Sequence, residues 1–303
     1  MTFSGVRPGG EEILLPSPVR AQFDSARDAP ADSFQGVFPL GKSPGVLTGL
    51  KIRGTRGETL FSGIADIQRE SSSGSGNLLR LTCRGLAGLL LDSEAVPRHY
   101  SFPSLPVIFE RHVKPYGFSG YRGDGRAFQG TLRIAKGMSE WQAAAAFCKN
   151  FLGVAPRVRG DCFDASGETA GSPIRFDNLR GVRYFGAEVK NRCCDRISEI
   201  FVPDGDTGAY RSAAKDAETA ALGILRNRCL SGPSADTDAV LKAACRKAFA
   251  VTVDCPGAPA AETGAPAELR DPLLGAYGGL SVAAIRCVAD ADGTRTRYVL
   301  RKA

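Results

Sequence analysis

The pattern in this sequence that most directly suggests chemistry is a phosphate-binding loop motif at residues 36–43. These residues read GVFPLGKS and satisfy G-x-x-x-x-G-K-S at every position. The motif requires a buried strand before the loop and a helix that begins at its lysine, whose free N–H groups then hold phosphate. Residues 28–32 (DAPAD) are not a buried strand, and Pro44 and Gly45 follow the motif directly. We interpret the match as accidental and predict no cofactor-binding residues.

Three carboxylates, Asp161, Asp164 and Glu168, cluster in the segment DCFDASGE. A pair of carboxylates could cleave a glycan by acid–base catalysis if one pKa were raised and the separation were suitable. A calcium loop would need oxygen ligands at alternating positions, and Phe163 and Ala165 break that rule. Aspartate and glycine also favour turns, so we predict a hairpin tip here rather than a catalytic pair.

Histidine and cysteine offer few further sites. His112 falls on the apolar stripe of a predicted helix and His99 lies in a polar connection, and no G-x-S-x-G elbow supplies a nucleophile for either. The nine cysteines include no C-x-x-C pair, so a zinc site has few candidate ligands, and we expect most of them to be small buried hydrophobes. We therefore predict no catalytic residues, no metal ligands and no enzymatic activity.

The composition indicates a folded protein of ordinary surface chemistry. The chain has 303 residues, of which 43% are hydrophobic and 23% charged, with a net charge of +7. That charge permits contact with nucleic acid but does not indicate it. No apolar run approaches the roughly 20 residues of a membrane span, and the first residues lack a secretory signal pattern. We expect synthesis in the cytosol and no membrane insertion.

Strand patterns dominate the first hundred residues. Residues 60–68 and 77–83 flank a Ser/Gly-rich turn and predict a hairpin, and residues 86–92 carry leucines at helical spacing. Residues 1–11 are rich in glycine, proline and charge, so we expect a loose arm. Further strands are predicted at residues 13–15, 19–23, 33–38 and 46–52, which suits a small barrel or sandwich.

Helices are predicted at 103–114 and at 139–153, the second beginning at Ser139 as N-cap. The second half is predicted to hold strands at 182–189, 196–202, 249–253, 280–288 and 294–300. An alanine-rich stretch at 209–229 and residues 236–247 read as helical, the latter with an acidic start and a basic end. Residues 256–272 are rich in proline, glycine and alanine and predict a surface loop.

The segment 61–100, FSGIADIQRESSSGSGNLLRLTCRGLAGLLLDSEAVPRHY, resembles the baseplate hub proteins of contractile phage tails and phage-tail-like bacteriocins, the late control protein D superfamily. It shares with them a strand with Phe and Gly, a variable turn, a strand that closes on an arginine, and a short leucine-rich helix. Shorter matches lie before and after this segment, at residues 26–33, 105–112, 137–141 and 292–300, and their order along the chain is the same as in that family.

This resemblance implies a mixed, mainly β (α+β) fold with two tube-type β-barrel modules and helical insertions. The implied domains are an arm at 1–11, a first barrel module at 12–100, a helical insertion at 101–152 and a second β-rich module at 153–303 with its own helical insertion around 208–247. It further implies a homotrimer. The protein would be a structural late protein of a virion or bacteriocin-like particle, and that particle would be assembled in the bacterial host cytoplasm.

In such a contractile injection system, the trimer would form a pseudo-six-fold ring that adapts the tail tube to the central spike. Its expected partners are the tube protein, the spike protein and other baseplate proteins. The alternative is a tail-associated cell-wall (peptidoglycan) hydrolase or glycan-binding protein, in which Asp161 and Asp164 would be the residues to test.

Overall fold

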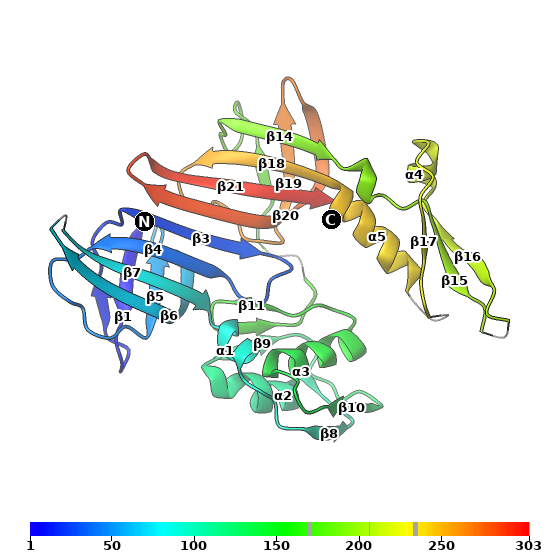
Figure 1. The fold of residues 1–303 in the computed structure, drawn as a ribbon, viewed down its shortest axis with the longest axis horizontal. Coiled ribbons are helices and arrows are strands. Elements are labelled where there is room, and N and C mark those ends of the chain that lie inside the picture. Colours follow the sequence, from blue (N-terminus) through cyan, green and yellow to red (C-terminus); the bar gives the residue numbers. More distant parts are fainter. Residues whose placement is uncertain (75, 169–170, 206, 233–235, 303) are drawn as a thin grey trace. The chain divides into compact units, whose positions relative to one another are not determined.

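The structure is a computed structural model that describes residues 1–74, 76–168, 171–205, 207–232 and 236–302. The fold is mainly β with short helices (Figure 1). The chain divides into two compact units. Unit 1 comprises Met1–Ala170, Pro256–Thr263 and Ala284–Thr296, and unit 2 comprises Gly171–Cys255, Gly264–Ala283 and Arg297–Ala303. The long strands β20 (Gly275–Asp290) and β21 (Gly293–Lys302) contribute residues to both units.

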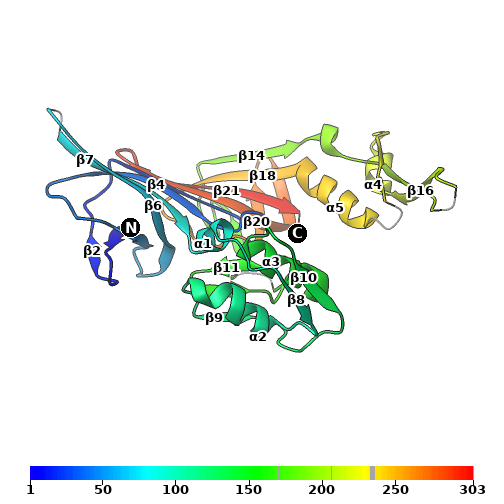
Figure 2. The same cartoon turned by 60° about the horizontal axis from the view of Figure 1, so that its bottom comes forward.

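Unit 1 is built on an antiparallel sheet in the order β20-β3-β4-β7-β6-β5-β1-β2. The bounds of its strands are β1 Thr2–Val6, β2 Glu12–Leu14, β3 Arg20–Ala26, β4 Ser33–Pro39, β5 Gly49–Arg53, β6 Thr59–Ser73 and β7 Gly76–Gly85. The predicted hairpin at 60–83 is confirmed as β6–β7. Strand β5 pairs with β6 only as far as Ile64, so the outer part of β6 has no described strand partner on that edge. The hairpin extends beyond its neighbours there (Figure 2).

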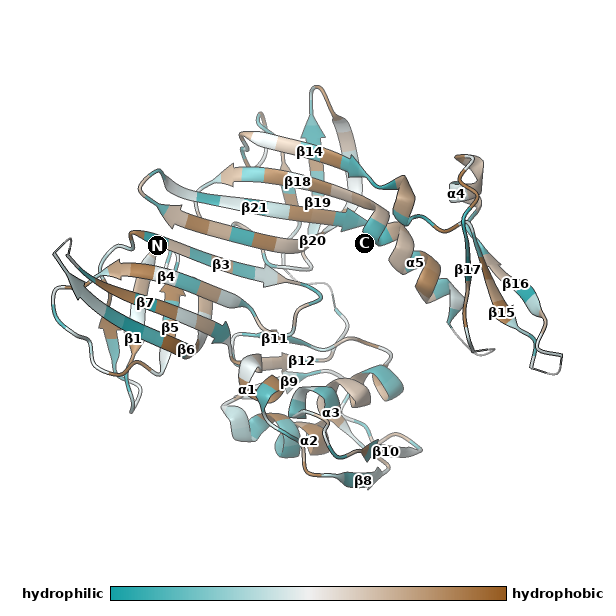
Figure 3. Ribbon diagram, in the orientation of Figure 1, coloured by the Kyte–Doolittle hydropathy of each residue, from teal (hydrophilic) through white to brown (hydrophobic). Residues whose placement is uncertain are grey.

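Aromatic side chains fill the core of this sheet. Strand β4 alternates buried and exposed positions, which places Phe34 and Phe38 on the inner face. The Phe38 ring lies 5.6 Å from that of Phe3, and the Phe34 ring lies 5.8 Å from that of Phe61. A Cβ at Gly36 would lie 2.5 Å from Phe34 Cζ, so the absence of a side chain lets both rings pack over the strand. Figure 3 shows the alternation as bands along the strands of the sheet.

A helical region follows the sheet within unit 1. It contains α1 (Ala87–Asp92), α2 (Leu105–Ile108), which widens into the π-helix η1 (Phe109–Val113), and α3 (Glu140–Phe147), which continues as the π-helix η3 (Cys148–Leu152). These confirm the predicted helices at 86–92, 103–114 and 139–153. Ser139 and Gln142 form a capping box at the start of α3, and Gly153 ends η3 with a left-handed backbone (φ 69°).

Two small sheets complete this region. One pairs β8 (Arg98–Ser101) with β10 (Thr131–Ile134), and the other is ordered β11-β12-β9. Its strands are β9 Gly120–Arg122, β11 Arg157–Arg159 and β12 Cys162–Asp164. The 3-10 helix η2 (Lys114–Tyr116) follows η1. A shared apolar cluster includes Leu105, Phe109, Trp141 and Phe147, so the helices and small sheets enclose one core.

Unit 2 has an open sheet in the order β14-β18-β21-β20-β19-β13. The new strands are β13 Ile174–Phe176, β14 Gly186–Asn191, β18 Phe249–Pro256 and β19 Pro266–Asp271. A smaller sheet is ordered β16-β15-β17, with β15 Glu199–Pro203, β16 Tyr210–Lys215 and β17 Asn227–Cys229. The remaining elements are η4 (Cys193–Asp195), α4 (Ala217–Ala221) and α5 (Thr237–Ala248). Helix α5 confirms the helix predicted at 236–247, with Asp236 as its N-cap.

Several sequence expectations are wrong. Residues 1–11 are not a loose arm, because Thr2–Val6 pairs with β5 and buries Phe3. The predicted helix at 209–229 contains more strand than helix, because β16 and β17 both pair with β15 and only α4 is helical. The predicted loop at 256–272 contains β19, which pairs with β20 and β13. Nonlocal strand pairing overrides the local composition in each case.

The predicted closure into barrels is not confirmed. The described pairings give each main sheet an open strand order, with β2 at one end in unit 1 and β14 at one end in unit 2. Unit 1 includes both the first sheet and the helical region.

Candidate functional site

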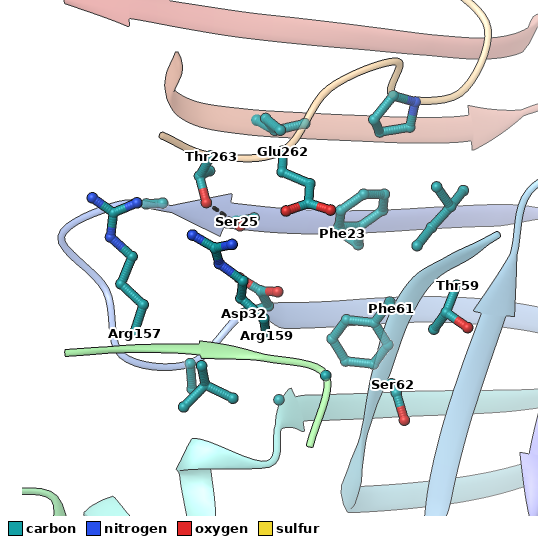
Figure 4. Close-up of a pocket in the computed structure, with 18 of the residues that line it drawn as sticks. Phe23, Ser25, Asp32, Thr59, Phe61, Ser62, Arg157, Arg159, Glu262 and Thr263 are labelled. Carbon is teal, nitrogen blue, oxygen red and sulfur yellow. Dashed lines mark hydrogen bonds between the residues drawn. The ribbon is translucent and has the colours of Figure 1, made fainter. Parts of the chain in front are cut away.

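A pocket with a volume of about 690 Å³ lies within unit 1. Its walls come from strand β3, the 26–32 turn, the start of β6, strand β11 and the segment 259–263 (Figure 4). That volume is in the range of ordinary ligand sites. Apolar and charged residues both line it, so it is a candidate binding site.

Two arginines enter this pocket from β11. Successive side chains on a strand point to opposite faces, so Arg157 and Arg159 share one face and Val158 takes the other. The hairpin from β11 to β12 turns at Gly160, which has a left-handed backbone (φ 60°). Both guanidinium groups extend from β11 toward Ser25 on β3 and the 259–263 segment (Figure 4).

The donors of these arginines are incompletely satisfied. Arg157 Nη1 and Arg159 Nη2 are buried and have no hydrogen-bond partner among the described residues. Arg159 Nη2 lies 3.0 Å from Asp164 Oδ2, a distance that allows ionic attraction although the two atoms do not form a hydrogen bond. Burial, and then the positive charges of Arg27 and Arg159, lower the pKa of Arg157. The pocket therefore has a cationic wall with unused donors.

The lining of the pocket also includes acidic and polar groups. Burial raises the pKa of Asp32, while a hydrogen bond from Ser25 acts in the opposite direction. Ser25 Oγ lies 3.5 Å from Thr263 Oγ1. Glu58 and Glu262 also line the pocket, and Glu58 accepts a hydrogen bond of 3.0 Å from the backbone N–H of Arg56.

The structure does not assemble the three candidate carboxylates into a catalytic pair. Asp161 lies at the β11–β12 turn, as the predicted hairpin tip requires, and Glu168 is exposed beyond β12. Asp164 is buried and accepts hydrogen bonds from the backbone N–H and hydroxyl of Ser166. Burial would raise the pKa of Asp164, but these bonds and the charge of Arg159 lower it below its usual value. A general acid needs the opposite shift.

His112 is buried in the helical region and is fully paired. Its Nδ1 lies 2.5 Å from Glu140 Oε2, and its Nε2 lies 2.8 Å from the Tyr100 hydroxyl. Tyr116 donates a hydrogen bond of 3.2 Å to Glu140 Oε1. His99 is exposed on β8. The burial of His112 agrees with its place on the apolar stripe of the predicted helix, whereas the sequence did not indicate its pairing with Glu140.

The phosphate-loop motif lacks the structure that its chemistry needs. Residues 36–39 lie within β4, and no helix is found between Leu40 and Thr48, all of which the structure describes. Lys42 is exposed.

All nine cysteines are free thiols, but the expectation that most are buried is wrong. Only Cys83, Cys148, Cys255 and Cys287 are buried. In the described part of the chain, no three His, Cys, Asp or Glu side chains converge as a metal site would need. No helix formed by the described residues is both long and apolar enough to cross a membrane.

Sequence reasoning missed the arginine pair of β11. The available signal was the alternation Arg-Val-Arg after Pro156, which predicts two like charges on one face of a strand. The residues around β11 gave no indication that this face would meet β3 and the segment 259–263. Each of these lies at least a hundred residues from β11 in the sequence.

The comparisons define the class of fold. In fold, the chain is similar to phage tail proteins and to a component of the type VI secretion system. The sequence matches no family model and no curated protein sequence.

Three solved structures illustrate the similarity. A tail protein from Neisseria meningitidis MC58 aligns over 100% of this chain and 97% of its own, with a TM-score of 0.73 and 20% identity. A 43 kDa tail protein of the prophage MuSo2 from Shewanella oneidensis aligns over 100% and 98%, with a TM-score of 0.73 and 14% identity. An Escherichia coli type VI secretion component, itself described as similar to T4 tail proteins, aligns over 95% and 74%, with a TM-score of 0.59 and 9% identity.

Proposed function

We propose that this protein is a structural hub of a contractile phage tail or tail-like particle, located in the baseplate. In this proposal three copies form a ring in which the two β-rich modules of each chain occupy quasi-equivalent positions. The ring joins the tail tube to the central spike and contacts other baseplate proteins. The observation that carries the proposal is the fold similarity to two tail proteins over the full length of both chains.

Exposed strand edges support assembly with neighbours. In unit 1, β2 pairs only with β1 among the described strands, and its Leu14 side chain is 76% exposed. In unit 2, β14 has β18 as its described partner, and Phe185 just before it is 66% exposed. An uncovered strand edge with an exposed apolar side chain favours pairing with another chain, and soluble proteins normally avoid such edges.

The native mass of the purified full chain tests the ring. We expect native mass spectrometry to show three copies of the 32.0 kDa chain, alone or after addition of the tube protein. Leu14→Asp and Phe185→Asp should each shift the population toward monomer by placing a charge at an edge. Leu273→Asp is the matched control, since Leu273 is 91% exposed in the turn between β19 and β20. A monomer under all these conditions would contradict the trimer.

A peptidoglycan-release assay tests the absence of enzymatic activity. We expect no release from the native chain, because the lowered pKa of Asp164 disfavours a proton donor. Release that disappears in Asp161→Asn or Asp164→Asn would instead establish a cell-wall hydrolase.

A further inference from the structure

The pocket of unit 1 combines a cationic wall with an apolar one. Arg157 and Arg159 carry two of the four buried side-chain polar atoms that have no hydrogen-bond partner among the described residues. Buried polar groups are normally satisfied, and an unsatisfied charged donor is costly. Both arginines lie on the same face of β11. Arg159 Nη2 already lies 3.0 Å from Asp164 Oδ2, whereas Arg157 Nη1 has no described partner, so an acceptor group beside Arg157 would satisfy the donor that lacks one.

The apolar wall lies beside this cationic one. Phe23 on β3, Phe61 on β6 and Ile285 on β20 line the same pocket, and all three side chains are buried. In Figure 4 the Phe23 and Phe61 rings lie on one side of the pocket, and the two arginines extend into it from β11 on the other side. The site therefore offers an acceptor-binding end and an apolar end.

The lining of the pocket is of mixed charge. Four arginines, Arg27, Arg56, Arg157 and Arg159, line it together with three carboxylates, Asp32, Glu58 and Glu262, so the balance favours an anionic group. A planar carboxylate matches the guanidinium fork and carries one charge. Inorganic phosphate has no apolar body to place against the apolar wall.

From this geometry we infer that the pocket binds a ligand with one carboxylate on an apolar body. The carboxylate lies between Arg157 and Arg159, and the apolar body lies against Phe23 and Phe61. The same chemistry is available from an acidic peptide segment of a neighbouring protein and from a free small carboxylic acid. Binding of this kind is independent of the proposed role in a tail.

Calorimetric titration of the full chain with defined probes tests this inference. The first pair is 3-phenylpropionate and its uncharged amide, 3-phenylpropanamide, which differ only in the carboxylate. The second pair is the blocked peptide acetyl-Glu-Phe-amide and its counterpart acetyl-Gln-Phe-amide. Inorganic phosphate is the third probe. We expect both carboxylates to bind at least about tenfold more tightly than their amides, because charge-assisted hydrogen bonds are lost in the amides.

Variants locate the binding. Arg157→Gln should weaken the binding of the carboxylate probes about tenfold and leave the amides unchanged. Arg157→Lys should give an intermediate loss, because lysine keeps the charge and loses the planar fork. Arg69→Gln is the matched control, since Arg69 is exposed on β6 and does not line the pocket. Thermal melting of each variant establishes that it is folded, and Phe61→Leu, which keeps an apolar side chain, should weaken all four organic probes.

Each outcome decides the inference. Tighter binding of the peptide identifies a protein segment as the natural source, and tighter binding of phenylpropionate identifies a small acid; both support the site. Equal affinity for acids and amides, equal affinity for phosphate, no binding of any probe, or full affinity in Arg157→Gln would overturn it.

Discussion

His112 and Glu140 form a buried pair that joins two helices of unit 1, with His112 Nδ1 2.5 Å from Glu140 Oε2. His112 lies in the π-helix η1 and Glu140 is the first residue of α3. The side chains are only 5% and 9% exposed, and hydroxyls of Tyr100 and Tyr116 meet the remaining polar atoms. Because every member has a partner, the network fixes how η1 and α3 pack in this region.

Breaking this pair should strongly destabilise the fold. His112→Ala leaves the Glu140 carboxylate buried with fewer partners, and we expect a loss of roughly 3–5 kcal/mol in the free energy of unfolding. Urea unfolding measures the loss. His99→Ala, at an exposed histidine of the same chain, should change stability by less than about 0.5 kcal/mol. Equal effects of the two substitutions would contradict a structural role for the pair.

Gly63 marks a close approach between β6 and β7. A Cβ at this position would lie 2.2 Å from the backbone oxygen of Arg84, which cannot move without disturbing the strand pairing. We expect Gly63→Ala to cost about 1–3 kcal/mol in urea unfolding. Gly41→Ala is the control because a Cβ at Gly41 would have no other atom within 4 Å, and it should be neutral or slightly stabilising. A neutral Gly63→Ala would show that the strands can separate at this point without cost.

The β6–β7 hairpin and α3 were predictable because their signals are local. Hairpin strands are separated by a Ser/Gly turn, and the capping of α3 by Ser139 depends on residues only three positions apart. The main strands of unit 1 were predictable in the same way, from the alternation of apolar and polar residues along each strand.

The features of the fold and the site that the sequence did not predict depend on contacts between residues far apart in the sequence. The stretch 210–215 is alanine-containing and charged, and it becomes strand β16 because β15 pairs with it. Phe3 becomes buried because β1 pairs with β5, almost fifty residues later. Likewise, the Arg157 and Arg159 pocket exists only because β3, β11 and the segment 259–263 meet in the folded chain.

Arg84 on β7 pairs with two carboxylates, Asp66 on β6 and Asp92 at the end of α1. Its Nε lies 2.7 Å from Asp66 Oδ2 and its Nη2 lies 2.5 Å from Asp92 Oδ2. Arg84→Lys keeps the charge but cannot contact both carboxylates as a planar fork, so we expect a loss of up to about 1 kcal/mol, which is limited by partial exposure. High salt should reduce the difference between variant and native protein. Arg80→Lys, at an exposed arginine of β7, is the control and should have little effect; a similar loss there would argue against the fork.

Tyr184 should make the stability of unit 2 fall in alkali. Its hydroxyl lies 2.5 Å from Asp271 Oδ2, and burial, followed by this hydrogen bond, raises the pKa of Tyr184 to about 12. An unfolded tyrosine has a pKa of about 10, so between these values the unfolded chain loses a proton that the folded chain keeps. The contribution is thus fully present below about pH 10 and is lost as pH rises toward about 12. Urea unfolding across this range should show the stability difference between native protein and Tyr184→Phe changing with pH. Tyr210→Phe, at a half-exposed tyrosine, should show a constant difference, and constant differences for both variants would refute the assignment.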